Sequence, residues 1–132
     1  MQETFCSLLI AATALAAQSS SPSDWIGVWQ GELDGQPSVT LTLAKDSGTL
    51  EGTLVLNIIS RDSRSPRIVA HEAHVLLQMR SQGDSITFQV KRIDRSAEPM
   101  EFTVERTAAD AAKIHCLNCG DDAPTVEMTK LD

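Results

Sequence analysis

The chain has 132 residues, of which 42% are hydrophobic and 22% are charged. This length suits one domain with its own core, and the composition excludes an intrinsically disordered chain. The formal net charge is −7, and it becomes −6 without the first sixteen residues, where Glu3 is the one charged side chain. Such an acidic domain repels both phosphate backbones and anionic lipids, which excludes nucleic acids and membrane surfaces as its natural partners.

The N-terminal residues 1–16 read as a signal peptide. Residues 6–17, CSLLIAATALAA, form an apolar stretch that is too short to span a bilayer, and Ala14-Leu15-Ala16 has the spacing that a signal peptidase accepts. We expect cleavage after Ala16 or Ala17, a polar tether over 17–23, and an exported domain over 24–132, periplasmic or extracellular, with no transmembrane segment. The alternative is an N-terminal helix of the mature chain, because basic residues are missing before the apolar stretch.

The rest of the chain alternates between apolar and polar residues with a period of two, which is typical of half-buried β-strands. Val39, Leu41 and Leu43, for example, alternate with Ser38, Thr40 and Thr42. Turn signals such as Asp34-Gly35 separate the alternating segments. Eight strands are predicted, over residues 25–33, 39–43, 50–58, 67–79, 86–90, 100–104, 114–116 and 126–128.

These strands predict an all-β fold, a single antiparallel up-and-down barrel of about eight strands, with a two-sheet β-sandwich as the alternative. A parallel α/β fold is excluded because helices do not alternate with the strands. The stretch between Thr107 and Ala112 is expected to be a short loop or a single helical turn. Gly27, Gly31 and Gly52 lie inside strands and predict bends or close backbone approach.

Gly27-Val28-Trp29 opens the first predicted strand and resembles the G-x-W motif of lipocalin-like (calycin) barrels. The wider stretch from Trp25 to Leu33 is similar to the opening of exported bacterial lipocalin-like domains of uncharacterised function. The resemblance implies a barrel with an internal cavity, in which the tryptophan closes one end and packs near a basic residue late in the chain. Lys130 is the residue placed late enough for that role.

A lipocalin-like barrel would hold a small apolar ligand between its inward-facing side chains. The candidate ligand-binding residues are Trp25, Leu43, Leu54, Leu56, Phe88 and Phe102. The alternative interpretation is that these large side chains, together with Trp29, fill the barrel as an ordinary core.

Cys116-Leu117-Asn118-Cys119 is the sharpest local motif in the chain. We favour a disulfide, because these two cysteines remain after cleavage in a compartment where disulfides persist. Free thiols are a second interpretation. A redox-active pair is a third, which the missing helix and the following Asp121-Asp122 disfavour. A zinc site is the fourth, and no other cofactor is expected. Since zinc needs four ligands, the ligand set would come from Cys116, Cys119, His71, His74 and His115.

The motif His71-Glu72-Ala73-His74 differs from the helical H-E-x-x-H of zinc proteases. A spacing of three residues in a strand puts the two imidazoles on opposite faces unless a bulge intervenes. No serine elbow and no phosphate-binding loop occurs in the sequence either, so we do not expect an enzyme.

Three functional hypotheses follow from the sequence. The favoured one is an exported binding module, with a small apolar ligand in the barrel. The first alternative is a cell-envelope interaction or inhibitor module that presents loops 60–66 and 93–99 to a protein partner. The second alternative is a metal or redox protein that uses Cys116 and Cys119.

Overall fold

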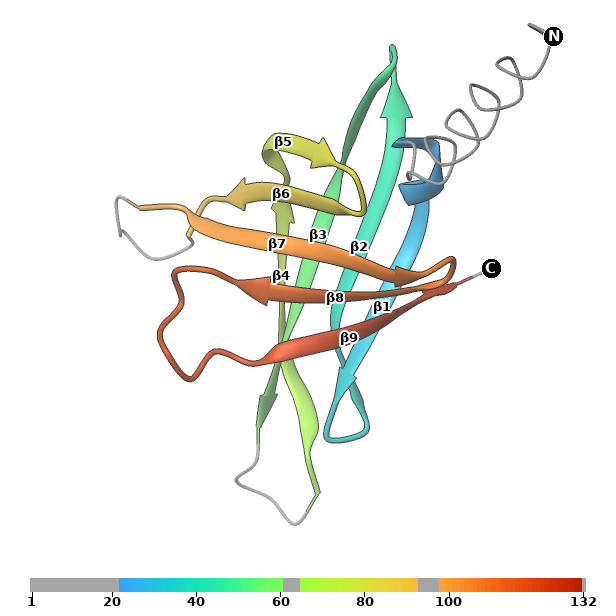
Figure 1. Cartoon of the computed structure of the whole chain (residues 1–132). Coiled ribbons are helices and arrows are strands. Elements are labelled where there is room, and N and C mark those ends of the chain that lie inside the picture. The colour runs from blue at the N-terminus through green and yellow to red at the C-terminus, as the bar shows by residue number, and fades with distance from the viewer. Residues whose placement is uncertain (1–21, 61–64, 93–97, 132) are drawn as a thin grey trace, which may run out of the picture.

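The structure, a computed structural model, describes residues 22–60, 65–92 and 98–131 of the chain. The predicted signal peptide and most of the tether lie outside these residues. The described part consists of a short 3-10 helix and nine antiparallel strands (Figure 1). The elements are η1 (Pro22–Trp25), β1 (Gly27–Leu33), β2 (Gln36–Asp46), β3 (Thr49–Ser60), β4 (Arg67–Val75), β5 (Leu77–Gln82), β6 (Ser85–Val90), β7 (Met100–Ala108), β8 (Ala111–Cys116) and β9 (Thr125–Leu131).

The nine strands form one curled sheet with the order β4-β3-β2-β1-β9-β8-β7-β6-β5. Strands that follow one another in the chain therefore pair, and the first strand, β1, also pairs with the last, β9. The exception is β4 and β5, which do not pair and lie at the two ends of the order. Figure 1 shows the consequence: β1 to β4 run upright in this view and β6 to β9 run crosswise to them. The sheet is a half-barrel, which confirms the predicted all-β, antiparallel class.

The strand expected over residues 67–79 is broken at Leu76 into β4 and β5, so the expected eight strands become nine. The Leu76 amide donates a hydrogen bond to the carbonyl of Gly52 on β3 (3.1 Å), where β4 leaves its partner strand. Gln78 then takes a positive φ of 50°, and the β5–β6 register shifts between Leu77 and Arg80. Because of this corner, the two consecutive strands β4 and β5 lie at opposite edges of the sheet. In the described residues no hydrogen-bonded ladder joins these two edge strands.

Two glycines inside strands stand where backbone and side chains approach closely, as the sequence predicts. A Cβ on Gly52 would collide with the carbonyl oxygen of Thr42 on β2. A Cβ on Gly31 would lie 2.6 Å from Cγ1 of Val126 on β9. Since any larger residue would push neighbouring strands apart, the glycines permit the tight curl of the sheet.

The helical alternative for residues 107–112 is wrong. Strand β7 continues to Ala108 and β8 begins at Ala111, so a tight hairpin turn at Ala109 and Asp110 joins them. The two strands pair up to Ala108 and Ala111, and the strand ladder outweighs the helix propensity of the alanines. The described residues contain no helix that could serve as a membrane span.

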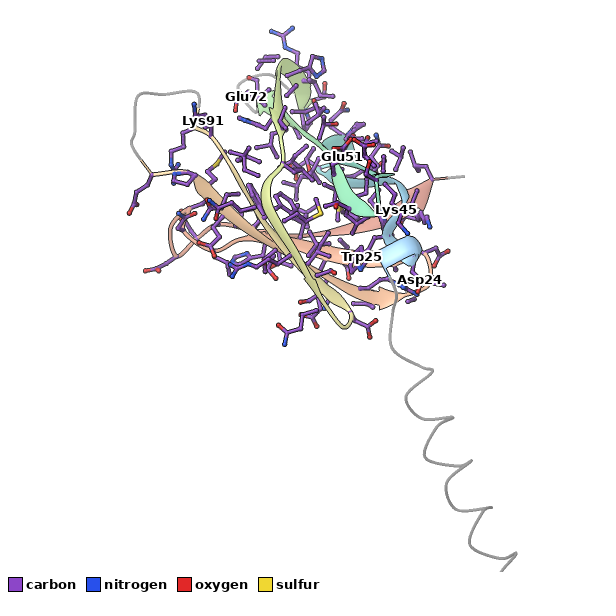
Figure 2. All side chains as sticks on the ribbon, turned by 90° about the horizontal axis from the view of Figure 1, so that it is seen from above. Asp24, Trp25, Lys45, Glu51, Glu72 and Lys91 are labelled. Atoms are coloured by element: carbon purple, nitrogen blue, oxygen red, sulfur yellow. A yellow bond between two sulfur atoms is a disulfide. The ribbon has the colours of Figure 1, made fainter. Side chains whose placement is uncertain are left out.

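Side chains crowd the space between the strands β1 to β4 and the strands β6 to β9 (Figure 2). The buried apolar ones among them form a single cluster. Phe88 and Phe102 stack there with ring centroids 5.6 Å apart. The buried apolar residues are Trp25, Trp29, Val39, Leu41, Leu43, Leu54, Leu76, Ile86, Phe88, Val90, Phe102, Val104, Ala112, Ile114, Cys116, Val126 and Met128. The middle of the half-barrel is therefore a packed core.

Candidate functional site

One end of the half-barrel is closed by η1 and the two tryptophans. Trp25, the last residue of η1, and Trp29 on β1 are both fully buried, with ring centroids 5.7 Å apart. The indole Nε1–H of Trp29 donates to the carbonyl oxygen of Trp25 at 3.0 Å. This hydrogen bond fixes the 3-10 turn over the end of the strands, so the tryptophans act as a plug.

Lys130 on β9 packs against this plug. It is the register partner of Trp29, and its Nζ lies 5.6 Å from the centroid of the indole ring, within cation–π distance. The Nζ also donates to the carbonyl oxygen of Asp24 (3.4 Å). Gly27 leaves room for the lysine, since a Cβ there would lie 2.8 Å from its Cε. A late basic residue thus stands beside the tryptophan of the G-x-W motif, as the resemblance implies.

The opposite end of the half-barrel holds an apolar pocket of about 250 Å³. It lies where β1 ends, β2 and β7 begin, and β8 runs into the loop that leads to β9. The pocket is lined by Leu33, Ser38, Val39, Leu56, Asn57, Met100, Phe102, Ile114, His115, Cys116, Cys119, Ala123, Pro124 and Val126. None of these lining residues is Asp, Glu, Lys or Arg, so the pocket suits an uncharged molecule, because an unpaired ion would lose its hydration there.

The structure separates the six candidate ligand-binding residues into two groups. Leu56 and Phe102 line the pocket. The other four are buried inside the core and are absent from the pocket lining, namely Trp25, Leu43, Leu54 and Phe88. The pocket lies where strands end, whereas the sequence pattern reveals only which face of a strand is apolar. Met100, Ile114 and Pro124 are therefore lining residues that sequence reasoning missed.

Ser38 is the lining residue that departs furthest from the sequence pattern. Its alternation with Val39 predicts an outward, polar-face position, but the side chain is 7% exposed. Glu32 pairs with Pro37 and Gly31 pairs with Val39, so Ser38 has no register partner on β1. This β-bulge explains the burial, because an extra residue in one strand re-aims its side chain.

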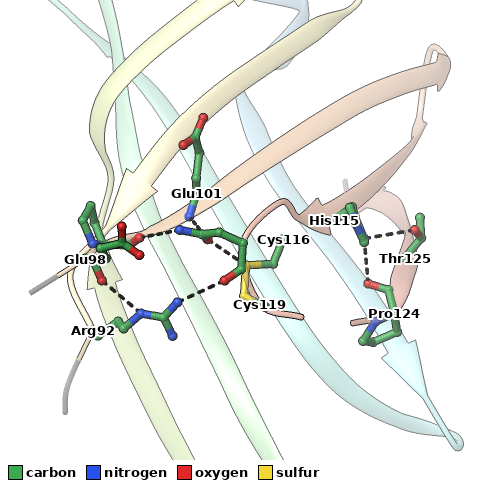
Figure 3. The surroundings of a disulfide bond; sticks show 10 residues. Arg92, Glu98, Glu101, His115, Cys116, Cys119, Pro124 and Thr125 are labelled. Carbon is green, nitrogen blue, oxygen red and sulfur yellow. Dashed lines mark hydrogen bonds between the residues drawn. A yellow bond between two sulfur atoms is a disulfide. The ribbon is translucent and has the colours of Figure 1, made fainter. Parts of the chain in front are cut away.

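The sulfur atoms of Cys116 and Cys119 lie at disulfide-bonding distance, and both residues line the pocket (Figure 3). Asn118, between them, fastens this short loop to the start of β7. Its Nδ2 donates to the carbonyl oxygen of Pro99 (2.9 Å), and its Oδ1 accepts a hydrogen bond from the amide of Glu101 (2.9 Å). The loop thus forms one wall of the pocket and is held by side-chain bonds as well as by the cysteines.

The three histidines lie apart and contact different groups. His71 and His74 lie on β4 at register positions opposite Asn57 and Leu54, which belong to opposite faces of β3. His74 is buried, and its Nε2 lies 3.5 Å from Oε1 of Glu72 without a hydrogen bond. His115 turns Nδ1 toward the carbonyl of Pro124 (3.3 Å) (Figure 3). Among the described residues, no three His, Cys, Asp or Glu side chains gather as metal ligands.

The loops that the interaction hypothesis invokes, 60–66 and 93–99, lie mostly outside the described residues.

Three comparisons with known proteins found no relative of this chain. No family model matches this chain, and no curated protein and no solved structure shows significant similarity to it. The pocket geometry and its chemistry are therefore the basis for a functional proposal.

Proposed function

We propose that this domain is an exported binding module that holds a small, neutral, apolar ligand at the open end of the half-barrel. The observation that supports the proposal is the apolar pocket beside Leu56 and Phe102, opposite the end that the tryptophans close. Ligand sites in proteins are typically apolar concavities with a few polar residues, and Asn57 and His115 are polar residues in this lining.

The volume of the pocket limits the size of the ligand. An apolar cavity of about 150 Å³ is enough to bind benzene, and pockets for drug-sized ligands begin at about 300 Å³. The volume of about 250 Å³ lies between these values. The proposed ligand is therefore a substituted single ring or a short branched chain, seated at the mouth of the domain, while the packed core fills the middle.

We also propose that the domain is lipocalin-like. Three observations support this. The strands form a meander whose first and last members pair, as β1 and β9 do. Gly27 and Trp29 stand at the start of β1. Lys130 packs on the indole at the closed end. A crystal structure with a bound ligand tests this proposal. It would show whether the two edge strands, β4 and β5, pair and so close the half-barrel into a barrel.

A titration with toluene, followed by amide resonances in NMR spectra, tests ligand binding. We expect saturable shifts that are confined to the starts of β2 and β7, the end of β8 and the loop after it. Leu56→Gln places an amide in the half-buried lining and should weaken binding at least tenfold, since its polar group loses hydration when the ring enters. Val75→Gln is the matched control, because Val75 is 67% exposed and lies outside the pocket.

Two results would contradict the binding proposal. Toluene could fail to shift these resonances at its solubility limit, or it could bind Leu56→Gln as tightly as the parent. If Leu56→Gln does not fold, Ala123→Phe replaces it. Ala123 lies in the loop before β9 and lines the pocket, so a larger side chain there should occupy the ligand's space.

Export is a separate proposal that concerns residues 1–23. Expression of the full chain in a bacterial cell, followed by fractionation and intact mass measurement, tests it. We expect protein outside the cytoplasm whose first residue is Ala17 or Gln18. An uncleaved chain that stays in the cytoplasm would overturn the proposal and would leave the pocket proposal standing.

A further inference from the structure

Strand β4 forms one edge of the sheet. It stands at the end of the strand order, and among the described residues no strand pairs with its outer side. Every second residue of an edge strand turns its backbone N–H and C=O away from the sheet, so β4 presents unpaired hydrogen-bonding groups along its length. These groups favour pairing with a further strand.

The opposite edge, β5, carries features that hinder such pairing. It is six residues long, Gln78 has a positive φ of 50°, and its register with β6 shifts between Leu77 and Arg80. Short, irregular and charged edge strands are the means by which proteins keep their sheets from joining. Strand β4 is nine residues long and contains neither Lys nor Pro. Val69 has no register partner on β3, but residues 70–75 pair with β3 without a break.

Exposed apolar side chains gather at this edge. The described residues expose six large apolar side chains, and four of them lie on β4 or close beside it, near the end of β3 and at the start of β5. They are Ile58 (44% exposed), Val69 (52%), Val75 (67%) and Leu77 (38%). Concentrated exposed apolar surface marks contact sites between proteins. The edge of β4 therefore combines unpaired backbone groups with side chains that gain by burial.

The sequence of β4 allows it to pair with itself in a second copy of the chain. Two identical antiparallel strands are related by a two-fold axis, so one residue must lie opposite itself at the centre. A pairing centred on Glu72 would place two carboxylates opposite each other, which destabilises a sheet. A pairing centred on His71 would bring Val69, where the register shifts, into the ladder. A pairing centred on Ala73 uses only the regular segment and places Glu72 opposite His74 of the second copy.

We infer that a second copy of this chain pairs with the edge of β4 in the register centred on Ala73. Residues 71–75 of the two copies then form an antiparallel ladder that joins both sheets into one. This register is the complementary one, because each Glu72 lies opposite an imidazole instead of a carboxylate. Since five residues from each copy make a small interface, the dimer is weak, with a dissociation constant of about 0.1–1 mM.

A charge-reversal pair at Ala73 tests the dimer and its register. Ala73 is exposed, so Lys or Glu at this position should leave the fold intact. In Ala73→Lys and in Ala73→Glu, like charges face each other across the two-fold axis, and we expect each dissociation constant to rise about fivefold. An equimolar mixture of the two variants places a lysine opposite a glutamate and should restore the association of the parent. Ser81→Lys and Ser81→Glu, at an exposed position on β5, are the matched controls.

Sedimentation equilibrium of residues 24–132, which hold the whole buried core, gives the dissociation constants over about 0.02–2 mM. Amide NMR spectra of the dilute variants check folding, and Val75→Lys replaces any Ala73 variant that does not fold. Weaker association in both Ala73 variants, with recovery in the mixture, supports the inference. It is overturned if the parent stays monomeric at the highest concentration, if the Ala73 variants associate as the parent does, or if the Ser81 variants weaken association equally.

Discussion

The Nζ atom of Lys130 lies 5.6 Å from the centroid of the Trp29 ring, although about a hundred residues separate the two in the sequence. The two residues are register partners on β9 and β1, where the first and last strands join. The same Nζ donates to the carbonyl of Asp24, and the Asp24 carboxylate lies 3.4 Å from Nη1 of Arg106 on β7. Side chains from two strands, β9 and β7, thus hold η1 at the closed end of the half-barrel.

Replacement of Lys130 by methionine tests this fastening, because methionine keeps an apolar stem but loses the charge. We expect Lys130→Met to lower the free energy of unfolding by about 1 kcal/mol through loss of the cation–π contact and the bond to Asp24. Lys45→Met, at an exposed position of β2, should change it by less than about 0.5 kcal/mol. Urea unfolding measures both variants, and equal effects would refute the role of Lys130.

The two tryptophans at the closed end make a matched pair for mutation. Both are fully buried, but Trp29 Nε1 donates to Trp25 whereas Trp25 Nε1 has no hydrogen-bond partner in the described structure. Trp29→Phe removes an existing hydrogen bond and leaves the carbonyl oxygen of Trp25 without its donor. Trp25→Phe removes only a donor that has no partner. We therefore expect Trp29→Phe to be the more destabilising change, by about 1–2 kcal/mol in urea unfolding. The opposite ranking would contradict this description of the plug.

Ser38 and Asn57 should respond to alanine in opposite directions. Ser38→Ala removes an unpaired buried hydroxyl, so the free energy of unfolding of the unliganded protein should stay equal or rise by about 1 kcal/mol. Asn57→Ala breaks the bonds to Pro37 and His71 and should lower it by about 1–2 kcal/mol. Thermal and urea unfolding measure both changes. A clear destabilisation by Ser38→Ala would mean that its hydroxyl has a partner inside the protein.

The disulfide between Cys116 and Cys119 should contribute little to stability. It closes a loop with a sequence separation of 3, and the chain-entropy term for so short a loop is about 2 kcal/mol at most. Asn118 also keeps its bonds to Pro99 and Glu101 when the cysteines are reduced. We expect a mass gain of two hydrogen atoms on reduction and a fold that persists. Alkylation of both cysteines in native, unreduced protein would refute the disulfide.

Much of this fold follows from local patterns that the sequence displays. Alternation over 39–43 and 100–104 predicts strands that the structure contains, and Asp34-Gly35 forms its hairpin with positive φ angles of 55° and 77°. The corner at Leu76 escapes prediction because the residues around it continue an extended pattern. It depends on a hydrogen bond to Gly52, which is distant in the sequence.

The candidate site is less predictable than the fold, for a geometric reason. Period-two alternation assigns Ser38 to the polar face, and a single extra residue in β2 reverses that assignment. The same alternation treats Leu54 and Leu56 alike, yet the first is fully buried and the second lines the pocket. Position along a strand relative to the end of the half-barrel depends on the register of all the strands, which no local pattern contains.

A crystal structure of residues 24–132 grown with toluene tests the central claim most directly. We predict one aromatic ring in the pocket, between Leu56 and Phe102. Continuous density for the protein's own side chains in that space, or a ring bound elsewhere on the domain, would contradict the account.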